Sequence, residues 1–191
     1  METPLKTQRL LLRRFRADDL DSFAAMNTDA AVMRYFRSPL TRDESAAFMQ
    51  RIDAHFDTHG FGFWAVEEIS SGNLVGLTGL ARVMFDAPFA NDARARGMPC
   101  VEIGWRFASG VWGRGYAPEA ARAALAAGFG GFGLDEIVAF TVPDNAPSRR
   151  VMQKIGMTYS PADDFEHPNL PEGHALRPHV LYRLKAADFA D

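Results

Sequence analysis

The stretch that decides the fold is Val101-Glu102-Ile103-Gly104-Trp105-Arg106-Phe107, followed four residues later by Trp112-Gly113-Arg114-Gly115-Tyr116-Ala117-Pro118-Glu119-Ala120. The first part, rich in β-branched and aromatic residues, predicts a strand. Two glycines and a Pro-Glu pair then predict a turn that leads directly into a helix. The start of a helix leaves backbone N–H groups without partners and carries a partial positive charge. Glycines let such amides approach an anion closely, so the stretch predicts a cradle for a phosphate or diphosphate.

Two other phosphate-binding motifs fit this stretch less well. The dinucleotide fingerprint G-x-G-x-x-G requires a third glycine where Pro118 stands, and no β–α–β unit with an acid about 20 residues further on follows cleanly. The Walker motif requires Gly-Lys followed by Ser or Thr, which this sequence lacks. A dinucleotide-binding oxidoreductase is kept as an alternative, and it predicts thermal stabilisation by NAD rather than by coenzyme A.

The pattern of the whole chain, residues 1–191, predicts one domain of the mixed α+β class. Thr41 and Glu44 form a capping box at the start of one helix, and Gly60 ends it. Helices are predicted over residues 18–27, 42–60, 118–129 and 145–155, and strands over 9–15, 61–68, 74–83, 100–108, 135–142 and 180–184. Residues 84–99 and 160–178 show no period and are predicted as loops that select the substrate.

Composition excludes several classes of protein. The 21 Lys and Arg against 24 Asp and Glu give a net charge of -3, so no basic field favours nucleic acid or an anionic membrane. We find no apolar run near the roughly 20 residues that cross a bilayer and no signal-peptide pattern at the start. The single cysteine, Cys100, excludes an internal disulfide framework and is expected to be a buried, inert thiol. We therefore expect a cytoplasmic protein.

Four segments together resemble the Gcn5-related N-acetyltransferase (GNAT) superfamily, and within it the branch of the ribosomal-protein N-terminal acetyltransferases. They are Thr7-Gln8-Arg9-Leu10-Leu11-Leu12-Arg13, Glu102-Ile103-Gly104-Trp105, the stretch from Trp112 to Ala120, and Asn145-Ala146-Pro147-Ser148-Arg149-Arg150-Val151-Met152-Gln153-Lys154-Ile155-Gly156-Met157. Their order and spacing extend the resemblance over about residues 5 to 184.

The resemblance implies a twisted, mostly antiparallel mixed sheet of about seven strands, flanked by about four helices and splayed between its fourth and fifth strands. It implies acetyl-CoA as co-substrate, with the pantetheine arm in the splay and the diphosphate on the amides from about Val111 to Ala117. The residues expected to bind the coenzyme are Phe107, Val111, Trp112, Gly113, Arg114, Gly115, Tyr116, Ala117, Asn145 and Ser148. Arg114 would add a cation near the phosphates or would lie in solvent.

Glu102 and Ser148 are the candidate catalytic residues. Acetyl transfer requires a neutral amine, and a carboxylate on the strand, directly or through water, would remove the proton. Relatives often carry such a glutamate at this strand position. The alternative is a structural role, in which Glu102 is a strand-face carboxylate in an ion pair. Many relatives place a tyrosine acid where this chain has Met152, so Ser148 is expected to assist the leaving thiolate, or else to cap its helix. The oxyanion donor is expected to be a backbone amide near Phe107.

The acceptor is expected to be a primary amine of a small molecule or a protein N-terminus, and the protein to be a monomer or homodimer. His167, His174 and His179 lie near several acids, but their spacing matches no zinc pattern, so we expect no metal. We expect the acids of 160–178 to attract a cationic amine instead. An acyl-CoA-binding sensor without catalysis is the alternative, supported by Met152.

Overall fold

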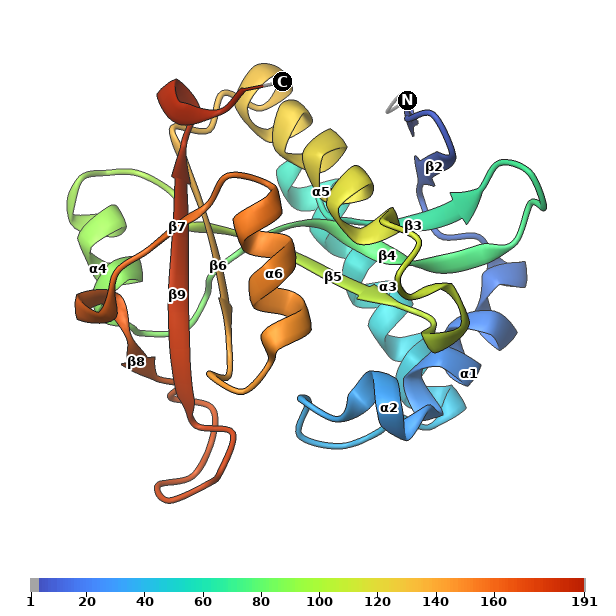
Figure 1. Cartoon of the computed structure of the whole chain (residues 1–191), viewed down its shortest axis with the longest axis horizontal. Coiled ribbons are helices and arrows are strands. Elements are labelled where there is room, and N and C mark those ends of the chain that lie inside the picture. Colours follow the sequence, from blue (N-terminus) through green and yellow to red (C-terminus); the bar gives the residue numbers. More distant parts are fainter. Residues whose placement is uncertain (1–3, 191) are drawn as a thin grey trace.

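In residues 4–190, the part of the chain that the computed structural model describes, nine strands form a twisted, mostly antiparallel sheet with helices packed against it (Figure 1). The helices are α1 (Leu20–Thr28), α2 (Ala30–Met33), α3 (Arg42–His59), α4 (Pro88–Ala95), α5 (Tyr116–Ala126) and α6 (Ala146–Lys154). The strands are β1 (Leu5–Lys6), β2 (Leu10–Arg13), β3 (Phe63–Glu68), β4 (Leu74–Arg82), β5 (Val101–Phe107), β6 (Glu136–Thr141), β7 (Thr158–Tyr159), β8 (Phe165–Glu166) and β9 (Pro178–Lys185). The predicted α+β class is confirmed.

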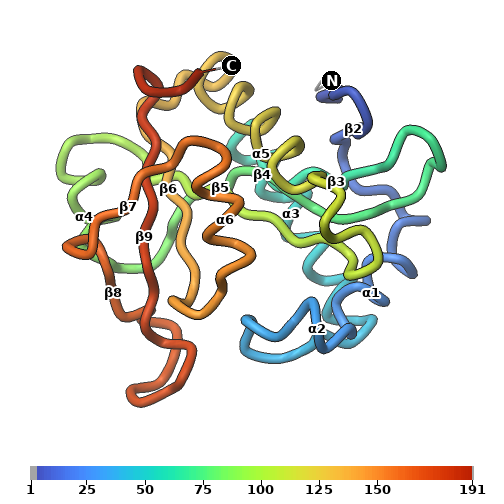
Figure 2. Tube along the Cα trace, viewed as in Figure 1, coloured from blue at the N-terminus to red at the C-terminus, as the bar shows by residue number. Residues whose placement is uncertain are grey.

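The sheet opens between β5 and β6. The strand order is β1-β2-β3-β4-β5-β6-β9-β7, and β8 pairs with β9 outside this path. All neighbours are antiparallel except β5 and β6, which are parallel and share one register position, Glu102 beside Val138. The antiparallel pair β4 and β5, in contrast, stays in register over seven positions. Beyond that position β5 and β6 still run in the same direction but separate towards their C-terminal ends, which confirms the predicted splay (Figure 2).

Local signals in the sequence explain where the longest helix begins and ends. Thr41 Oγ1 accepts a hydrogen bond of 3.2 Å from the N–H of Glu44, and Glu44 Oε2 accepts one of 2.7 Å from the N–H of Thr41. This is the predicted capping box, and it starts α3. Gly60 ends the helix with a φ of 78°, a left-handed conformation that favours glycine.

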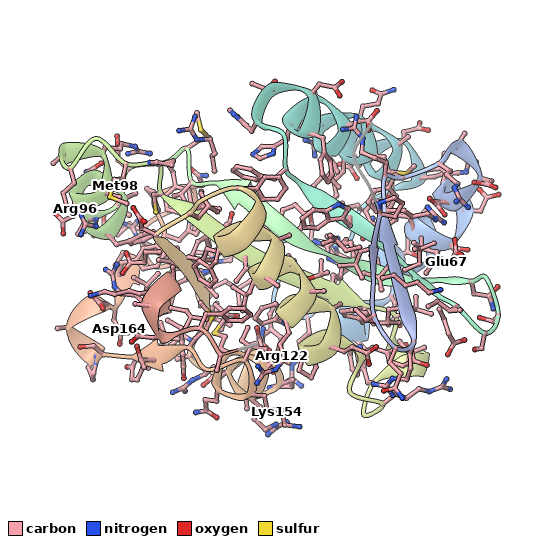
Figure 3. The ribbon with its side chains drawn as sticks, turned by 90° about the horizontal axis from the view of Figure 1, so that it is seen from above. Glu67, Arg96, Met98, Arg122, Lys154 and Asp164 are labelled. Carbon is pink, nitrogen blue, oxygen red and sulfur yellow. The ribbon has the colours of Figure 1, made fainter. Side chains whose placement is uncertain are left out.

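Helix α5 packs against the sheet through small side chains. Ala120, Ala121 and Ala124 are fully buried, and α5 contacts both β4 and β5. Since alanine adds almost no bulk, the helix axis can approach the strands closely and hold the preceding loop against the end of β5. The guanidinium of Arg122 then donates a hydrogen bond of 2.6 Å to the backbone oxygen of Lys154, which ties α5 to α6 (Figure 3).

The structure corrects four details of the predicted organisation. Residues 84–99 contain α4, which Pro88 begins and whose apolar face packs against side chains of β6, β8 and β9. The two prolines of the segment hide its short helical period. Helix α2 and the two-residue strands β1 and β7 were also not predicted, since so few residues show no period. Residues 160–178 contain β8. Finally, β5, α5 and β6 do form a parallel β–α–β connection, although the rest of the sheet is antiparallel.

No helix within residues 4–190 is both long enough and apolar enough to cross a bilayer.

Candidate active site

A cleft with a volume of about 1050 Å³ lies where β5 and β6 separate. Its walls come from α2 and the residues after it, from β5 and the loop that follows, from α6, and from the segment between His167 and His179. The hydroxyl of Tyr35 donates a hydrogen bond of 3.2 Å to the backbone oxygen of Asp144, so the α2 segment touches the turn between β6 and α6. The cleft is therefore bordered by segments far apart in the sequence.

The loop between β5 and α5 presents a row of backbone N–H groups. In the part of the chain that the structure describes, the N–H groups of residues 113–117 have no hydrogen-bond partner. Gly113 and Gly115 adopt φ angles of 78° and 81°, a left-handed conformation that glycine adopts most readily. The N–H groups of Val111 and Trp112 are different, because they donate to Ala108 and Ser109 within a 3₁₀ turn. Of the amides from 111 to 117 that were predicted to hold the diphosphate, those of Val111 and Trp112 therefore already have backbone partners.

A carboxylate from α5 fixes the loop to the first strands. Glu119 Oε1 accepts hydrogen bonds from Thr7 Oγ1 at 2.6 Å and from the N–H of Arg9 at 3.0 Å. Its Oε2 accepts one from Arg9 Nε at 2.7 Å. Arg9 Nη1 also donates to the backbone oxygen of Arg114 at 2.8 Å, in the middle of the loop. The motif around residues 7–13 therefore acts as a clamp on the loop, a role that the sequence did not indicate.

The side chains of Arg114 and Tyr116 point to a second carboxylate, Glu68. Arg114 Nη1 lies 3.6 Å from Glu68 Oε1, and the hydroxyl of Tyr116 donates a short hydrogen bond to the same oxygen. Hydrogen bonds from Ser71 and Tyr116, with the charge of Arg114 in addition, lower the pKa of Glu68. Arg114 therefore contributes its backbone N–H to the row of amides, while its guanidinium turns to the end of β3.

The last residue of β5 offers a backbone donor at the open edge. Antiparallel strands bond through alternate residues, and the N–H of Ala108 donates to Val75 of β4 at 3.0 Å. By this alternation, the N–H of Phe107 faces away from β4, towards the edge from which β6 has diverged. On the same edge, the indole Nε1 of Trp112 donates a hydrogen bond of 2.9 Å to the backbone oxygen of Phe107.

Glu102 is the only carboxylate on the wall of the cleft formed by the described residues. It forms no ion pair there, and burial raises its pKa from 4.5 to about 7. Gly104, two residues later on the same face, leaves room for the ring of Phe63, which also lines the cleft. The alternative of a strand-face carboxylate in an ion pair is therefore not seen in residues 4–190, and Glu102 has a pKa suited to a base near neutral pH.

The helix-capping role that was considered for Ser148 belongs to Asn145. Asn145, and not Ser148, caps α6, because its Oδ1 accepts a hydrogen bond of 3.2 Å from the N–H of Ser148. Asn145 Nδ2 donates to Thr141 Oγ1 at 2.9 Å, at the end of β6. The hydroxyl of Ser148 has no partner in the described residues and lines the cleft. Met152, one turn further on, is 1% exposed.

The acids of residues 160–178 do not face the cleft, which corrects the prediction that they attract a cationic amine. Asp163 accepts two hydrogen bonds from Arg183, at 2.9 and 3.1 Å. Glu166 pairs with Arg177 at 3.0 Å, and Asp164 accepts a hydrogen bond from Tyr159. The residues that this segment and the start of β9 bring to the cleft are His167, Asn169, Leu170, Leu176 and His179.

His167 and His179 lie with their ring centres 5.1 Å apart. Burial lowers the pKa of each imidazole. His179 Nδ1 donates a hydrogen bond of 3.0 Å to the backbone oxygen of Arg177, since a carbonyl can only accept. No group of three or more potential metal ligands occurs in residues 4–190. Cys100 is buried, and burial raises its thiol pKa to about 11, as expected of an inert residue.

Comparisons with known proteins agree with this geometry. The family described as "Acetyltransferase (GNAT) domain" matches residues 9–158. The chain belongs to the GNAT acetyltransferase family. It is 32% identical over 180 residues to "Uncharacterized N-acetyltransferase YnaD" of Bacillus subtilis (strain 168), which covers 94% of this chain and 95% of the relative.

Solved GNAT structures share the fold. The chain superposes with a TM-score of 0.76 on a GNAT-family acetyltransferase from Bacillus anthracis, with 28% identity over 97% of this chain and 99% of the other. A ribosomal-protein-S5-alanine acetyltransferase from Vibrio fischeri has a TM-score of 0.73 at 15% identity and full coverage of both chains. This second similarity concerns the fold alone.

Proposed function

We propose that this protein transfers the acetyl group of acetyl-CoA to a primary amine by direct attack within a ternary complex. The observation that carries the proposal is the row of five unpartnered N–H groups at residues 113–117, at the mouth of a cleft that also contains Glu102. Consecutive amides at a helix start suit the diphosphate of a coenzyme. The cleft between β5 and β6 would receive the pantetheine arm, with Asn145 and Ser148 beside it on the α6 side and Phe107 on the β5 side.

The chemistry follows from the residues on these walls. Glu102 accepts a proton from the acceptor ammonium, directly or through water, which leaves a neutral amine. The amine nitrogen bonds to the thioester carbonyl carbon, and the N–H of Phe107 stabilises the resulting oxyanion. The carbon–sulfur bond then breaks and the hydroxyl of Ser148 donates a hydrogen bond to the leaving thiolate. The attacking nitrogen loses its second proton as the amide forms, and this proton passes through water to the thiolate to give the free thiol. Holding both substrates in one cleft supplies much of the rate enhancement.

Two measurements test this function. Titration calorimetry should detect coenzyme A binding, and NAD serves as the negative control. Mixing the protein with acetyl-CoA and a panel of amines should then release free thiol only when an acceptor is present. Coenzyme binding without thiol release from any acceptor would count against catalysis.

A second function, a non-catalytic acyl-CoA sensor, is favoured by one observation, the buried Met152 at the position of the usual tyrosine acid. Measuring turnover and coenzyme affinity in Glu102→Gln and Ser148→Ala distinguishes the two functions. An enzyme loses turnover and keeps its coenzyme affinity, whereas a sensor has no turnover to lose.

A further inference from the structure

Arg106 is a partly buried cation without a carboxylate partner in residues 4–190. It lies on β5 four residues after Glu102 and lines the same cleft. Its Nη1 donates a hydrogen bond of 2.5 Å to Asn27 Oδ1, and Asn27 in turn donates one of 3.0 Å to Ser45. Its Nε is buried and has no hydrogen-bond partner in residues 4–190. Nη2 also has no partner there but keeps contact with solvent, so one whole edge of the guanidinium is unused.

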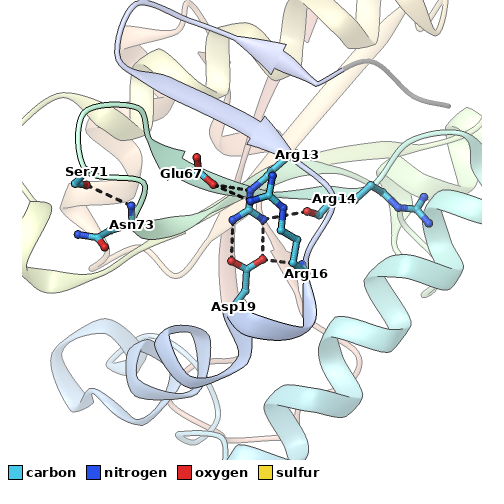
Figure 4. Close-up of polar contacts among 7 residues, drawn as sticks. All are labelled: Arg13, Arg14, Arg16, Asp19, Glu67, Ser71 and Asn73. Atoms are coloured by element: carbon cyan, nitrogen blue, oxygen red, sulfur yellow. Dashed lines mark hydrogen bonds and ion pairs between the residues drawn. The ribbon is translucent and has the colours of Figure 1, made fainter.

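Other arginines of this protein use that same edge to hold a carboxylate. Arg183 donates from Nε and Nη2 to the two oxygens of Asp163, at 2.9 and 3.1 Å. Arg13, which is 6% exposed, is surrounded by Asp19 and Glu67 (Figure 4). A planar fork of two N–H groups matches the geometry of a carboxylate, and burying a cation without such a partner is costly. Arg106 therefore stands apart from the pattern that this chain follows elsewhere.

The surroundings hold the guanidinium of Arg106 in place without neutralising it. Its central carbon lies 4.1 Å from the ring centre of Phe36 and 5.8 Å from that of Phe48. Asn27 and Ser45, which anchor its other edge, are both fully buried. Burial lowers the pKa of Arg106 to about 10, so the group remains charged at neutral pH. A fixed, charged and partly unpaired donor is preorganised for an anionic ligand.

The charge of the cleft points the same way. The cationic residues on its wall are Arg34, Arg37, Arg106, Arg150 and Lys154. The described residues contribute only one acid to the wall, Glu102, although the protein as a whole carries a net charge of -3. Arg150 and Lys154 come from α6, whereas Arg34 and Arg37 come from the segment after α2, on either side of Tyr35 and Phe36. The wall of the cleft is therefore basic, in contrast to the protein as a whole.

We propose that the Nε and Nη2 edge of Arg106 binds a carboxylate of the acceptor, so that preferred substrates carry an amine and a carboxylate in one molecule. This inference rests on the proposed acetyl transfer. The carboxylate is either the α-carboxylate of a free amino acid or an acidic side chain near the N-terminus of a peptide. In both cases the two carboxylate oxygens of the acceptor bind Arg106 in the way that the two oxygens of Asp163 bind Arg183.

The test compares acceptors that differ only by carboxylate or carboxamide. One arm uses free amino acids and their amides, and the other uses peptide amides with Asp or Asn as second residue. Binding is measured with coenzyme A present, which requires no chemistry, and kcat/KM is measured with acetyl-CoA. The wild-type protein should favour the carboxylate member at least tenfold in one arm, mainly through KM. Arg106→Gln should reduce the preference to less than twofold, and Arg106→Lys should restore part of it.

Arg51→Gln is the matched control, because Arg51 also lies over Phe48, at 5.4 Å, but outside the cleft. Equal binding of carboxylate and carboxamide by the wild-type protein would overturn the proposal, and so would a preference that survives in Arg106→Gln. A tenfold loss of coenzyme A affinity in Arg106→Gln would also overturn it, since Arg106 would then belong to the coenzyme site. Carboxylate-selective binding without thiol release would support the subsite while removing the proposed function.

Discussion

Arg9 and Glu119 are 110 residues apart in the sequence, yet the Nε of Arg9 donates a hydrogen bond of 2.7 Å to Glu119 Oε2. The same guanidinium reaches the backbone oxygen of Arg114 at 2.8 Å. The pair therefore connects the start of the sheet, the first turn of α5 and the loop with the unpartnered amides. A carboxylate at this helix end also interacts favourably with the helix dipole. The geometry of the loop depends on residues from both halves of the chain.

The first prediction concerns this clamp. Glu119→Gln should weaken coenzyme A binding about tenfold, which corresponds to about 1.4 kcal/mol, because the loop amides lose their fixed orientation. Titration calorimetry measures the change. Arg42→Gln is the control, since it removes a comparable surface pair with Asp21, whose two side chains are 61% and 83% exposed. An unchanged affinity in Glu119→Gln would mean that the loop holds its shape without the clamp.

The second prediction concerns the two glycines of the loop. Gly113→Ala and Gly115→Ala each place a side chain on a residue with φ near 80°, at a cost of about 1 kcal/mol or more. A relaxed backbone would turn the neighbouring N–H groups away from the ligand, so coenzyme A affinity should fall more than tenfold. Gly110→Ala is the matched control, because a Cβ there meets nothing within 4 Å and its φ is not left-handed.

Much of the fold could be predicted because its signals are local. The alternation in residues 101–107, the capping box at Thr41 and the glycines before α5 each describe their own segment, and the structure contains each of these elements. Helix α4 was missed because Pro88 begins it, Pro99 follows it, and its eight residues are too few to show a clear period.

The partners of charged side chains could not be predicted, because they depend on contacts between distant segments. Asp163 lies in an acidic segment that suggested a cation-binding surface. Its carboxylate is instead paired with Arg183, a residue of β9. The opposite holds for Arg106, which has no carboxylate partner in residues 4–190. The residues next to it in the sequence give no sign of this. Glu102 and Arg106 are four positions apart on one strand. This even spacing was the available sign that their side chains lie on the same face of the sheet.

The third prediction is the pH dependence of activity. If Glu102 acts as the base, kcat/KM should rise with pH to a plateau with an inflection near its pKa of about 7. The acceptor amine titrates separately, at roughly 8 to 10. Glu102→Gln should lower kcat at least 100-fold and remove the inflection near 7, while coenzyme A affinity changes less than twofold. Glu172→Gln, an exposed glutamate outside the cleft, should leave the profile unchanged.

The same carboxyl group makes a prediction about stability. The pKa of Glu102 is higher in the folded protein than the ordinary 4.5, so the folded state holds its proton more tightly than the unfolded state. Stability is therefore lost as pH rises from about 4.5 to about 7, by roughly 3 kcal/mol at about 1.4 kcal/mol per pKa unit. Glu102→Gln should thus raise the free energy of unfolding by about 2–3 kcal/mol at pH 8 and by almost nothing at pH 4.5. Denaturant unfolding at both pH values measures it, and an equal effect at both would exclude burial of the charge as the cause.

The last prediction separates the two roles considered for Ser148. Its backbone N–H, not its hydroxyl, completes the cap with Asn145, so Ser148→Ala should keep the fold and the coenzyme A affinity within about twofold. If the hydroxyl assists the leaving thiolate, kcat should fall about 10- to 100-fold, and Ser148→Thr should recover part of it. Asn145→Ala should instead lower stability by about 1 kcal/mol, because it removes the cap itself. Full activity in Ser148→Ala would show that the thiolate leaves without this hydroxyl, and since Met152 carries no proton to donate, solvent would then have to protonate the sulfur.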